Sequence, residues 1–273
     1  MKNSTGNTNV WLWFTVPISI LLAIAAGGGV FLGGLYRDNP YFAAQARGQD
    51  LISLVVVLPT LIIAAFLARR GSHRGRLLWM GGLVYLVYTY VVAAFDVKFN
   101  ILFLVYVALL GCSLYALIGG LVTTDMAGIK TAFTEETPAK AVSIYLAALA
   151  ILFYFMWLGE IVPALMAGNI PQSIRDNGTP TNAVHVLDMA WILPAFGITA
   201  VNLWRKQALG YTLAEVFLSY AVFLVLAILG MVLFMAWDGQ PVVVPQVVIF
   251  GALLAISLGM LIWYMKNLRS PCE

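Results

Sequence analysis

The sequence contains very little charge. Only 10% of its 273 residues are Asp, Glu, Lys or Arg, and 62% are hydrophobic, whereas about a quarter of a typical soluble domain is charged. No long polar stretch remains between the apolar segments, so most of the chain is expected to lie out of contact with water. The net charge is only +3, and no tract of Lys and Arg is present that would bind nucleic acid, so no nucleic-acid partner is expected.

Residues that carry redox, metal or cofactor chemistry are also scarce. The two cysteines, Cys112 and Cys272, do not form a C-x-x-C motif, which argues against a disulfide framework and against a thiol oxidoreductase. The two histidines, His73 and His185, are too few for a cytochrome with paired axial ligands. No H-E-x-x-H motif, Gly-rich phosphate loop or mid-helix Lys for a retinal Schiff base occurs. We therefore expect no cofactor.

Long apolar runs make up most of the chain. A bilayer core of about 30 Å requires about 20 apolar residues in a helix, and the alternation expected of a membrane barrel is absent. The first run is too long for a signal-peptide core, so it is interpreted as a retained helix. The sequence predicts an all-α polytopic bundle of eight transmembrane helices in the lipid bilayer, in roughly these ranges: Val10–Tyr36, Pro40–Ala68, Leu77–Phe95, Ile101–Thr123, Lys140–Ala167, Pro180–Trp204, Tyr211–Trp237 and Pro245–Met265.

Basic residues are distributed unevenly between the two ends of these helices. If the N-terminus is cytoplasmic, the inner segments contain eleven Lys and Arg residues, whereas the outer loops contain only Arg37, Arg47, Lys98 and Arg175. The positive-inside rule then places both termini in the cytoplasm. Asn39-Pro40 and Thr179-Pro180 are expected helix starts, because each places a polar cap before a proline at the first helical position.

The second and sixth predicted helices share a pattern. Asp50 precedes a Leu-Pro pair at Pro59 and a basic helix end, and Asp188 precedes a Leu-Pro pair at Pro194 and another basic end. The pattern suggests a parallel 4+4 repeat, an arrangement in which transporters place the substrate between the halves. The distance from Asp to Pro differs by three residues, however, and the alternative is chance recurrence in apolar helices. The possible halves are residues 1–123 and 140–273.

Four acids interrupt or bound the apolar runs at a similar depth. Counting 1.5 Å per helical residue places Asp50, Asp96, Glu160 and Asp188 roughly 25–30 Å from the basic inner ends. His185 lies one turn from Asp188 on the same helix face. A carboxylate within a bilayer is costly and is usually paired or functional. The sequence therefore predicts an outward-facing polar pocket, with these substrate-binding residues: Asp50, Glu160, His185, Asp188 and Gln49.

Two other interpretations of these acids remain open. They could lie in the membrane interface, solvated or paired with Arg47 and Lys98, which belong to the same region of the sequence. Alternatively, His185 and Asp188, with Asp50 or Glu160, could supply the ligands of a metal ion.

Three further features carry expectations of their own. Glu215 is expected to pair with Arg205 or Lys206, or else to serve as a proton or ion step. The stripe of small residues at Ala25, Gly29 and Gly33 is expected to pack against another helix. The aromatic groups at Tyr85, Tyr88 and Tyr90 and at 153–157 are assigned to core packing or lipid contact, with a lipid-tail groove as the alternative.

Two blocks of sequence resemble those of uncharacterised bacterial multi-pass inner-membrane proteins. They are Gly48-Gln49-Asp50-Leu51, and Phe99–Leu109 continuing to Ser113–Leu117. The resemblance covers the second to fourth and the sixth and seventh predicted helices. It implies a location in the bacterial inner membrane and no known activity, so it transfers no catalytic residue.

The sequence is compatible with three classes of function. A carrier or binding protein for a small or lipid-like substrate is favoured by the suggested repeat, the mid-helix prolines and the level of acids. A non-catalytic scaffold or sensor subunit needs no special residues. A membrane-embedded lipid-modifying enzyme would need an acid/base set at the interface, which only the predicted pocket residues could supply.

Overall fold

The computed structural model describes residues 10–269 and is built from helices, with one isolated β-bridge between Phe133 and Leu268. Eight of the helices in this part of the chain are long and apolar enough to cross a membrane, as the sequence predicts. The chain is therefore an all-α, multi-pass integral membrane protein. The eight spans are Val10–Phe31, Pro40–Arg69, His73–Phe95, Phe103–Val122, Ala139–Met166, Ala183–Trp204, Ala208–Trp237 and Val244–Lys266.

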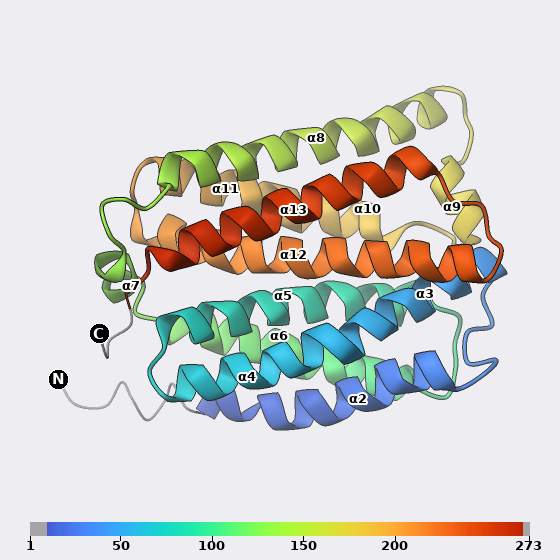
Figure 1. Ribbon diagram of the computed structural model, residues 1–273. Helices are drawn as coiled ribbons and strands as arrows, with labels where there is room; N and C mark the ends of the chain where they lie inside the picture. Colours follow the sequence, from blue (N-terminus) through green and yellow to red (C-terminus); the bar gives the residue numbers. More distant parts are fainter. Residues whose placement is uncertain (1–9, 270–273) are drawn as a thin grey trace.

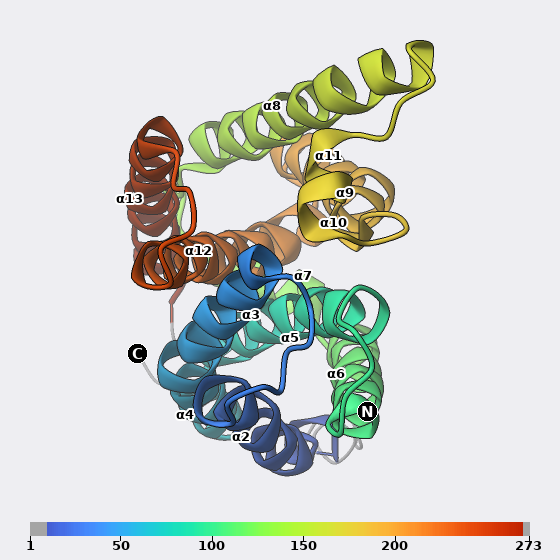
Figure 2. The same ribbon diagram turned by 90° about the vertical axis from the view of Figure 1, so that its right-hand side faces the viewer.

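The first four spans form a closed ring. Each helix packs against the next, and α2 returns to contact α6 (Figure 2). The ring is closed partly by Trp11, whose indole lies so near Gly119 that a Cβ there would overlap it. Its elements are α2 (Thr15–Phe31), α3 (Pro40–Ile52), the π-helical turn η1 (Ser53–Val57), α4 (Leu58–Arg69), α5 (His73–Phe95) and α6 (Phe103–Val122).

The last four spans form a second ring that is more open. Far fewer residues of α8 and α13 contact each other than of α2 and α6. Figure 2 shows α8 and α13 diverging. The Tyr145 and Ser257 hydroxyls join them by a hydrogen bond of 2.5 Å. The elements are α8 (Ala139–Met166), α10 (Ala183–Leu187), the π-helical turn η2 (Asp188–Ile192), α11 (Leu193–Trp204), α12 (Ala208–Trp237) and α13 (Val244–Lys266).

Two short helices mark the opposite ends of the molecule (Figure 1). At one end, α7 (Met126–Ala132) joins the rings. Asp125 caps it by accepting a hydrogen bond from the Gly128 amide. At the other end, α9 (Gln172–Asn177) lies beside the start of α3. These ends are called the α7 end and the α9 end below.

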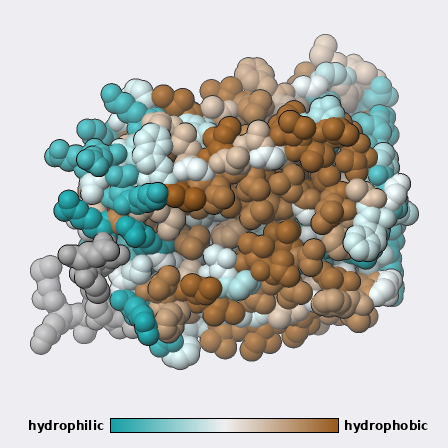
Figure 3. Space-filling view, in the orientation of Figure 1, coloured by the Kyte–Doolittle hydropathy of each residue, from teal (hydrophilic) through white to brown (hydrophobic). Residues whose placement is uncertain are grey.

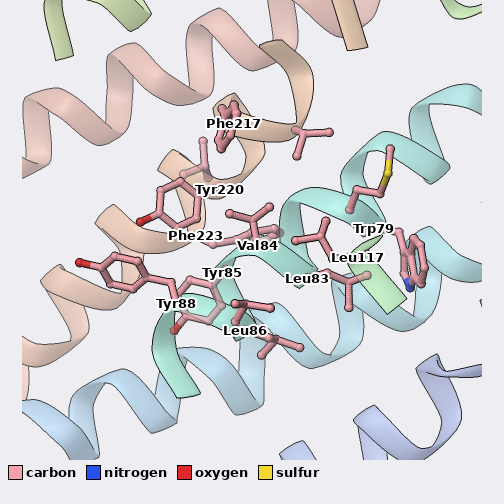
Figure 4. Close-up of a cluster of buried hydrophobic side chains, with 14 of the residues drawn as sticks. Trp79, Leu83, Val84, Tyr85, Leu86, Tyr88, Leu117, Phe217, Tyr220 and Phe223 are labelled. Carbon is pink, nitrogen blue, oxygen red and sulfur yellow. The ribbon is translucent and has the colours of Figure 1, made fainter. Parts of the chain in front are cut away.

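The two rings join through α12, which packs against α3 and α5. The closest approach is between Gly48 on α3 and Gly230 on α12, where the two backbones touch. Buried aromatic residues from α5 and α12 fill the centre of the joint, among them Tyr85, Tyr220 and Phe223 (Figure 4). In contrast, the face of the molecule shown in Figure 3 carries a broad apolar band with hydrophilic residues towards both ends, as contact with lipid tails requires.

The helix ends agree with the sequence prediction to within two residues except at four places. The third and seventh spans begin at His73 and Ala208, before the predicted Leu77 and Tyr211, and the end of the first span and the start of the sixth also differ. Asn39 caps α3 as predicted, because its side chain accepts a hydrogen bond from the Phe42 amide at 2.9 Å. The first span ends at Phe31 and not at Tyr36, since the chain leaves the helix before Gly34, whose φ is +77°. Thr179-Pro180 does not start a helix; α10 begins at Ala183 and is capped by Asn182.

The second and sixth spans share an irregular helical turn that could not be seen in the sequence. Each contains a five-residue π-helical turn immediately before its Leu-Pro pair. The turns η1 and η2, the helices α4 and α11 and the starts of α5 and α12 are all separated by the same 135 residues. This register matches Asp188 with Ser53, and His185 with Asp50. It therefore explains why the Asp-to-Pro distances differ by three residues.

The connections that follow these spans also correspond at 135 residues. Gly71 and Lys206 both adopt positive φ angles, of 89° and 54°, and Lys206 is the one non-glycine residue to do so among residues 10–269. Gly75 and Gly210 follow them, and each packs against the backbone of the helix before it. Glycine is needed at both positions because a Cβ would overlap that backbone.

Candidate functional site

A cavity of about 850 Å³ lies where the open ring meets α3 and α5. Its walls come from α3, α5, α8, α11, α12 and α13, and α9 borders it at the α9 end. Most of its lining is apolar or aromatic. Four of the residues singled out from the sequence line it together: Gln49, Asp50, Glu160 and Asp188.

Asp188 is held by hydrogen bonds from two other helices. It is the first residue of η2 and is 7% exposed. The Tyr88 hydroxyl on α5 donates to Oδ1 at 3.0 Å, and the Trp157 indole N–H on α8 donates to Oδ2 at 2.8 Å. One carboxylate thus joins α5, α8 and the sixth span at the cavity wall. π-helical turns occur frequently at functional sites, and here the turn places an acid in the cavity wall.

Asp50 lies in the first ring and receives a hydrogen bond from the Tyr36 hydroxyl on its Oδ2. Tyr36 belongs to the connection after the first span, and burial followed by the charge of Asp50 raises its pKa well above the usual value for tyrosine. The tyrosine therefore remains a proton donor to the carboxylate. Gly29 makes room for this pair, because a Cβ at that position would overlap Asp50 and lie 2.8 Å from the Tyr36 oxygen. Within the small-residue stripe, Gly29 is in close contact whereas Gly33 faces open space.

Two further polar contacts connect α3 and η1 to α5 beside Asp50. The Gln49 side-chain amide donates to the Thr89 hydroxyl at 2.8 Å. The Ser53 and Tyr85 hydroxyls are also 2.8 Å apart. Gln49 and Thr89 both line the cavity, so a fixed polar pair lies next to the carboxylate.

Glu160 fastens α9 to the wall of the cavity. Its Oε1 accepts a hydrogen bond from the Ser173 amide at 2.7 Å. His185 Nε2 is 3.8 Å from Glu160 Oε2 and 3.3 Å from the Ser173 hydroxyl, and its ring lies 4.5 Å from that of Trp157. His185 itself is buried and is not part of the cavity lining. The structure therefore places His185 behind Trp157 and Glu160, so it does not line the cavity as the predicted substrate-binding residue should.

Asp96 and Asp176 also line the cavity near the α9 end. Asp96 accepts a hydrogen bond from the Ala183 amide at 2.9 Å, and burial raises its pKa above the usual value. Asp176 receives a hydrogen bond from Gln172 at 2.6 Å. Asp96, the fourth of the acids predicted to lie at one depth, therefore belongs to the same cavity, together with Asp176 of α9, which the sequence did not single out.

The basic residues nearest these acids in the sequence, Arg47 and Lys98, form no ion pairs with them in the part of the chain that the structure describes. The Arg47 guanidinium pairs with Asp238 at 2.9 Å, and the Lys98 backbone amide donates to Asp38. In residues 10–269 neither side chain forms an ion pair with Asp50, Asp96, Glu160 or Asp188. This does not support the interpretation that pairs the acids with Arg47 and Lys98. In the same part of the chain, no three His, Cys, Asp or Glu residues are arranged to hold a metal ion.

Glu215 lies outside the cavity lining. It is fully buried on α12, where the Ser219 hydroxyl donates to Oε1 at 3.4 Å. Within the described residues its Oε2 has no hydrogen-bond partner, and no salt bridge joins it to Arg205 or Lys206. The predicted pairing is therefore wrong, because Glu215 is buried in the packed core whereas Arg205 and Lys206 are exposed.

The aromatic side chains of the cavity were not predicted as site residues. Tyr88, Tyr90, Trp157 and Tyr220 line it. The first three belong to aromatic runs assigned to core packing or lipid contact, with a lipid-tail groove as the alternative. A tyrosine in an apolar helix gives the same sequence signal whether it faces a packed core or a cavity. The useful signal was the coincidence of aromatic runs with acids at the same depth.

Comparisons with protein-family models, with curated proteins and with solved structures find no match. The functional argument therefore rests on the geometry and chemistry of the cavity.

Proposed function

We propose that this membrane protein is a carrier or binding protein for a small, lipid-like molecule, which it binds in the cavity between its two rings. The observation that carries the proposal is the cavity itself. Its volume of about 850 Å³ falls within the range of about 300–1,000 Å³ typical of sites for organic ligands. Its lining also has the usual composition of such sites, namely a largely apolar wall with a few fixed polar groups.

We further propose that the two rings are copies of one four-helix unit, with halves at residues 1–123 and 140–273. Support comes from the constant spacing of 135 residues between the π-helical turns, the Leu-Pro pairs and the following turns. Transporters built from parallel repeats bind their substrates between the halves. The cavity lies at such a position, because α3 and α5 of the first half form part of the wall around the open ring of the second.

We place the protein in the bacterial inner membrane, with both termini in the cytoplasm and the α9 end outside. The distribution of basic residues supports this orientation. In a variant lacking both native cysteines, Arg175→Cys should react in intact cells with a thiol reagent that does not cross membranes, whereas Glu136→Cys should react only after lysis. Both positions are exposed. Labelling of position 136 in intact cells would reverse the orientation.

Binding can be tested with dodecyl amphiphiles that differ only in their head group: the alcohol, the amine, the trimethylammonium and the sulfate. Equilibrium dialysis of the protein in nanodiscs, with protein-free nanodiscs as the blank, should show saturable binding of at least one of them. Ala93→Trp and Ala221→Trp, which fill the cavity from α5 and α12, should abolish that binding.

The matched control is Ala255→Trp, which adds the same side chain on α13 at an exposed position outside the cavity lining. It should bind as the native chain does. Saturable binding that survives both filling variants would contradict the proposed function, as would the absence of saturable binding for every probe.

A further inference from the structure

We infer that the ligand of this cavity is an amphipathic amine that binds in its protonated form. Its ammonium group would lie near Asp188, and its apolar part along α8 and α13. The inference rests on the proposed function, because it names the class of ligand for the same cavity.

The charge of the cavity is of one sign. Its lining includes five carboxylates and, among the described residues, no Lys, Arg or His. The carboxylates are those of Asp50, Asp96, Glu160, Asp176 and Asp188. Three of them, Asp50, Asp96 and Asp188, are buried. Buried charges in proteins are normally paired, and the nearby Arg47 is already paired with Asp238. A cationic ligand would supply the countercharge that the chain does not provide.

The aromatic rings around Asp188 suit an ammonium group. The hydrogen bonds from Tyr88 and Trp157 fix these two rings beside the carboxylate. Tyr220 packs edge-on against Tyr88 with ring centroids 5.7 Å apart, and Phe196 contacts Tyr220 in turn. Aromatic faces attract cations through their quadrupole, and aromatic side chains are used in proteins to bind organic ammonium groups. Anions gain nothing from such faces.

Two buried hydroxyls in the cavity wall are free to accept a hydrogen bond from an N–H group of the ligand. Tyr90 and Tyr220 are 1% and 0% exposed, both line the cavity, and neither hydroxyl has a hydrogen-bond partner within residues 10–269. Figure 4 shows the hydroxyls of Tyr88 and Tyr220 directed to the same side of the aromatic cluster, opposite Trp79. A protonated amine can donate to Asp188 and to a tyrosine oxygen together. A quaternary ammonium group has no N–H and cannot.

The remaining wall has the character of a tail site. It is formed by α8 and α13, whose side chains in the middle of the cavity are apolar, including Leu149, Leu152, Phe153, Phe250 and Leu253. The five carboxylates come from other elements or, for Glu160, from the α9 end of α8. The separation of acids from apolar side chains matches a molecule with one charged end.

The same four dodecyl probes test this inference in nanodiscs of zwitterionic lipid. Dodecylamine is protonated at neutral pH and should bind at least about tenfold more tightly than dodecanol, with dodecyl sulfate weakest. Asp188→Asn should remove that preference while dodecanol binding persists. Tyr220→Phe should weaken amine binding more than trimethylammonium binding. Asp38→Asn, which neutralises an acid outside the cavity lining, should leave the preference unchanged.

The possible outcomes separate this inference from the proposed function. If dodecanol or dodecyl sulfate binds as tightly as dodecylamine or more tightly, and Ala221→Trp blocks that binding, the inference of an amine ligand is wrong. The proposed binding function would then still hold. An amine preference that persists in Asp188→Asn would also overturn the inference of an amine ligand. If Asp188→Asn is not recovered as a monodisperse protein, Tyr220→Phe decides, and equal weakening of the amine and trimethylammonium probes would count against the inference. Failure of all four probes would contradict both proposals.

Discussion

Replacing Gly48 by alanine is expected to prevent the two rings from packing, so that little folded protein is recovered. The new Cβ would overlap the Gly230 carbonyl group and lie 2.6 Å from the Met231 Cα. These are backbone atoms, which cannot rotate away, so α3 and α12 would have to separate. Overpacking typically costs about 1–3 kcal/mol, and a backbone clash at the main joint should exceed about 3 kcal/mol. In a helix without such a clash, alanine is more favourable than glycine by about 1 kcal/mol. A loss of stability in Gly48→Ala would therefore have to come from the clash.

The yield of monodisperse protein and its melting temperature in detergent measure this effect. Gly111→Ala in α6 is the matched control, because a Cβ there would meet nothing within 4 Å; it should be neutral or slightly stabilising. Gly230→Ala should fall between the two, since its contacts are the flexible Ile52 side chain and the Gly48 carbonyl oxygen. Equal melting temperatures for Gly48→Ala and Gly111→Ala would refute this account of the joint.

Gly29→Ala should disrupt the Asp50 end of the cavity. The added Cβ would overlap the carboxylate and lie 2.8 Å from the Tyr36 hydroxyl, so the hydrogen bond between them must break. When a buried carboxylate loses its hydrogen-bond donor, the folded protein is destabilised by about 1–3 kcal/mol or more. We expect a clear fall in melting temperature, and Tyr36→Phe should reproduce the part that comes from the lost hydrogen bond.

Gly27→Ala is the control for this substitution, because it lies in the same helix and its Cβ would face open space. It should be as stable as the native protein. If Gly29→Ala is equally stable, then Asp50 and Tyr36 are not held as described, and their place in the cavity wall would need revision.

Most of the fold could be predicted from the sequence because the bilayer imposes a simple length requirement. An apolar run of about 20 residues has few alternatives to a membrane-spanning helix. The errors occurred where local chemistry decides the boundary. Gly34 permits the backbone to leave the first helix early, and the Asn182 side chain, not Thr179, caps the sixth.

The sequence could predict how deep in the membrane the residues of the candidate site lie, but not which way each side chain points from its helix. Counting residues placed Asp50, Glu160 and Asp188 at one level, and they line one cavity. The rotation of each side chain about its helix axis depends on packing and on the π-helical turns, in which backbone hydrogen bonds shift without any change of composition. That is why His185 was expected to face the ligand and instead lies behind Trp157.

The position of α3 has a consequence for how the cavity relates to the stability of the whole chain. Gly48 contacts α12 at the joint, and the next two residues, Gln49 and Asp50, line the cavity. A molecule bound in the cavity would therefore touch both rings at once and act as a non-covalent crosslink between them. By mass action, a ligand present at 100 times its dissociation constant would add about 2.7 kcal/mol to the stability of the joined state. If the proposed function holds, ligand binding and the association of the two rings would thus be thermodynamically linked.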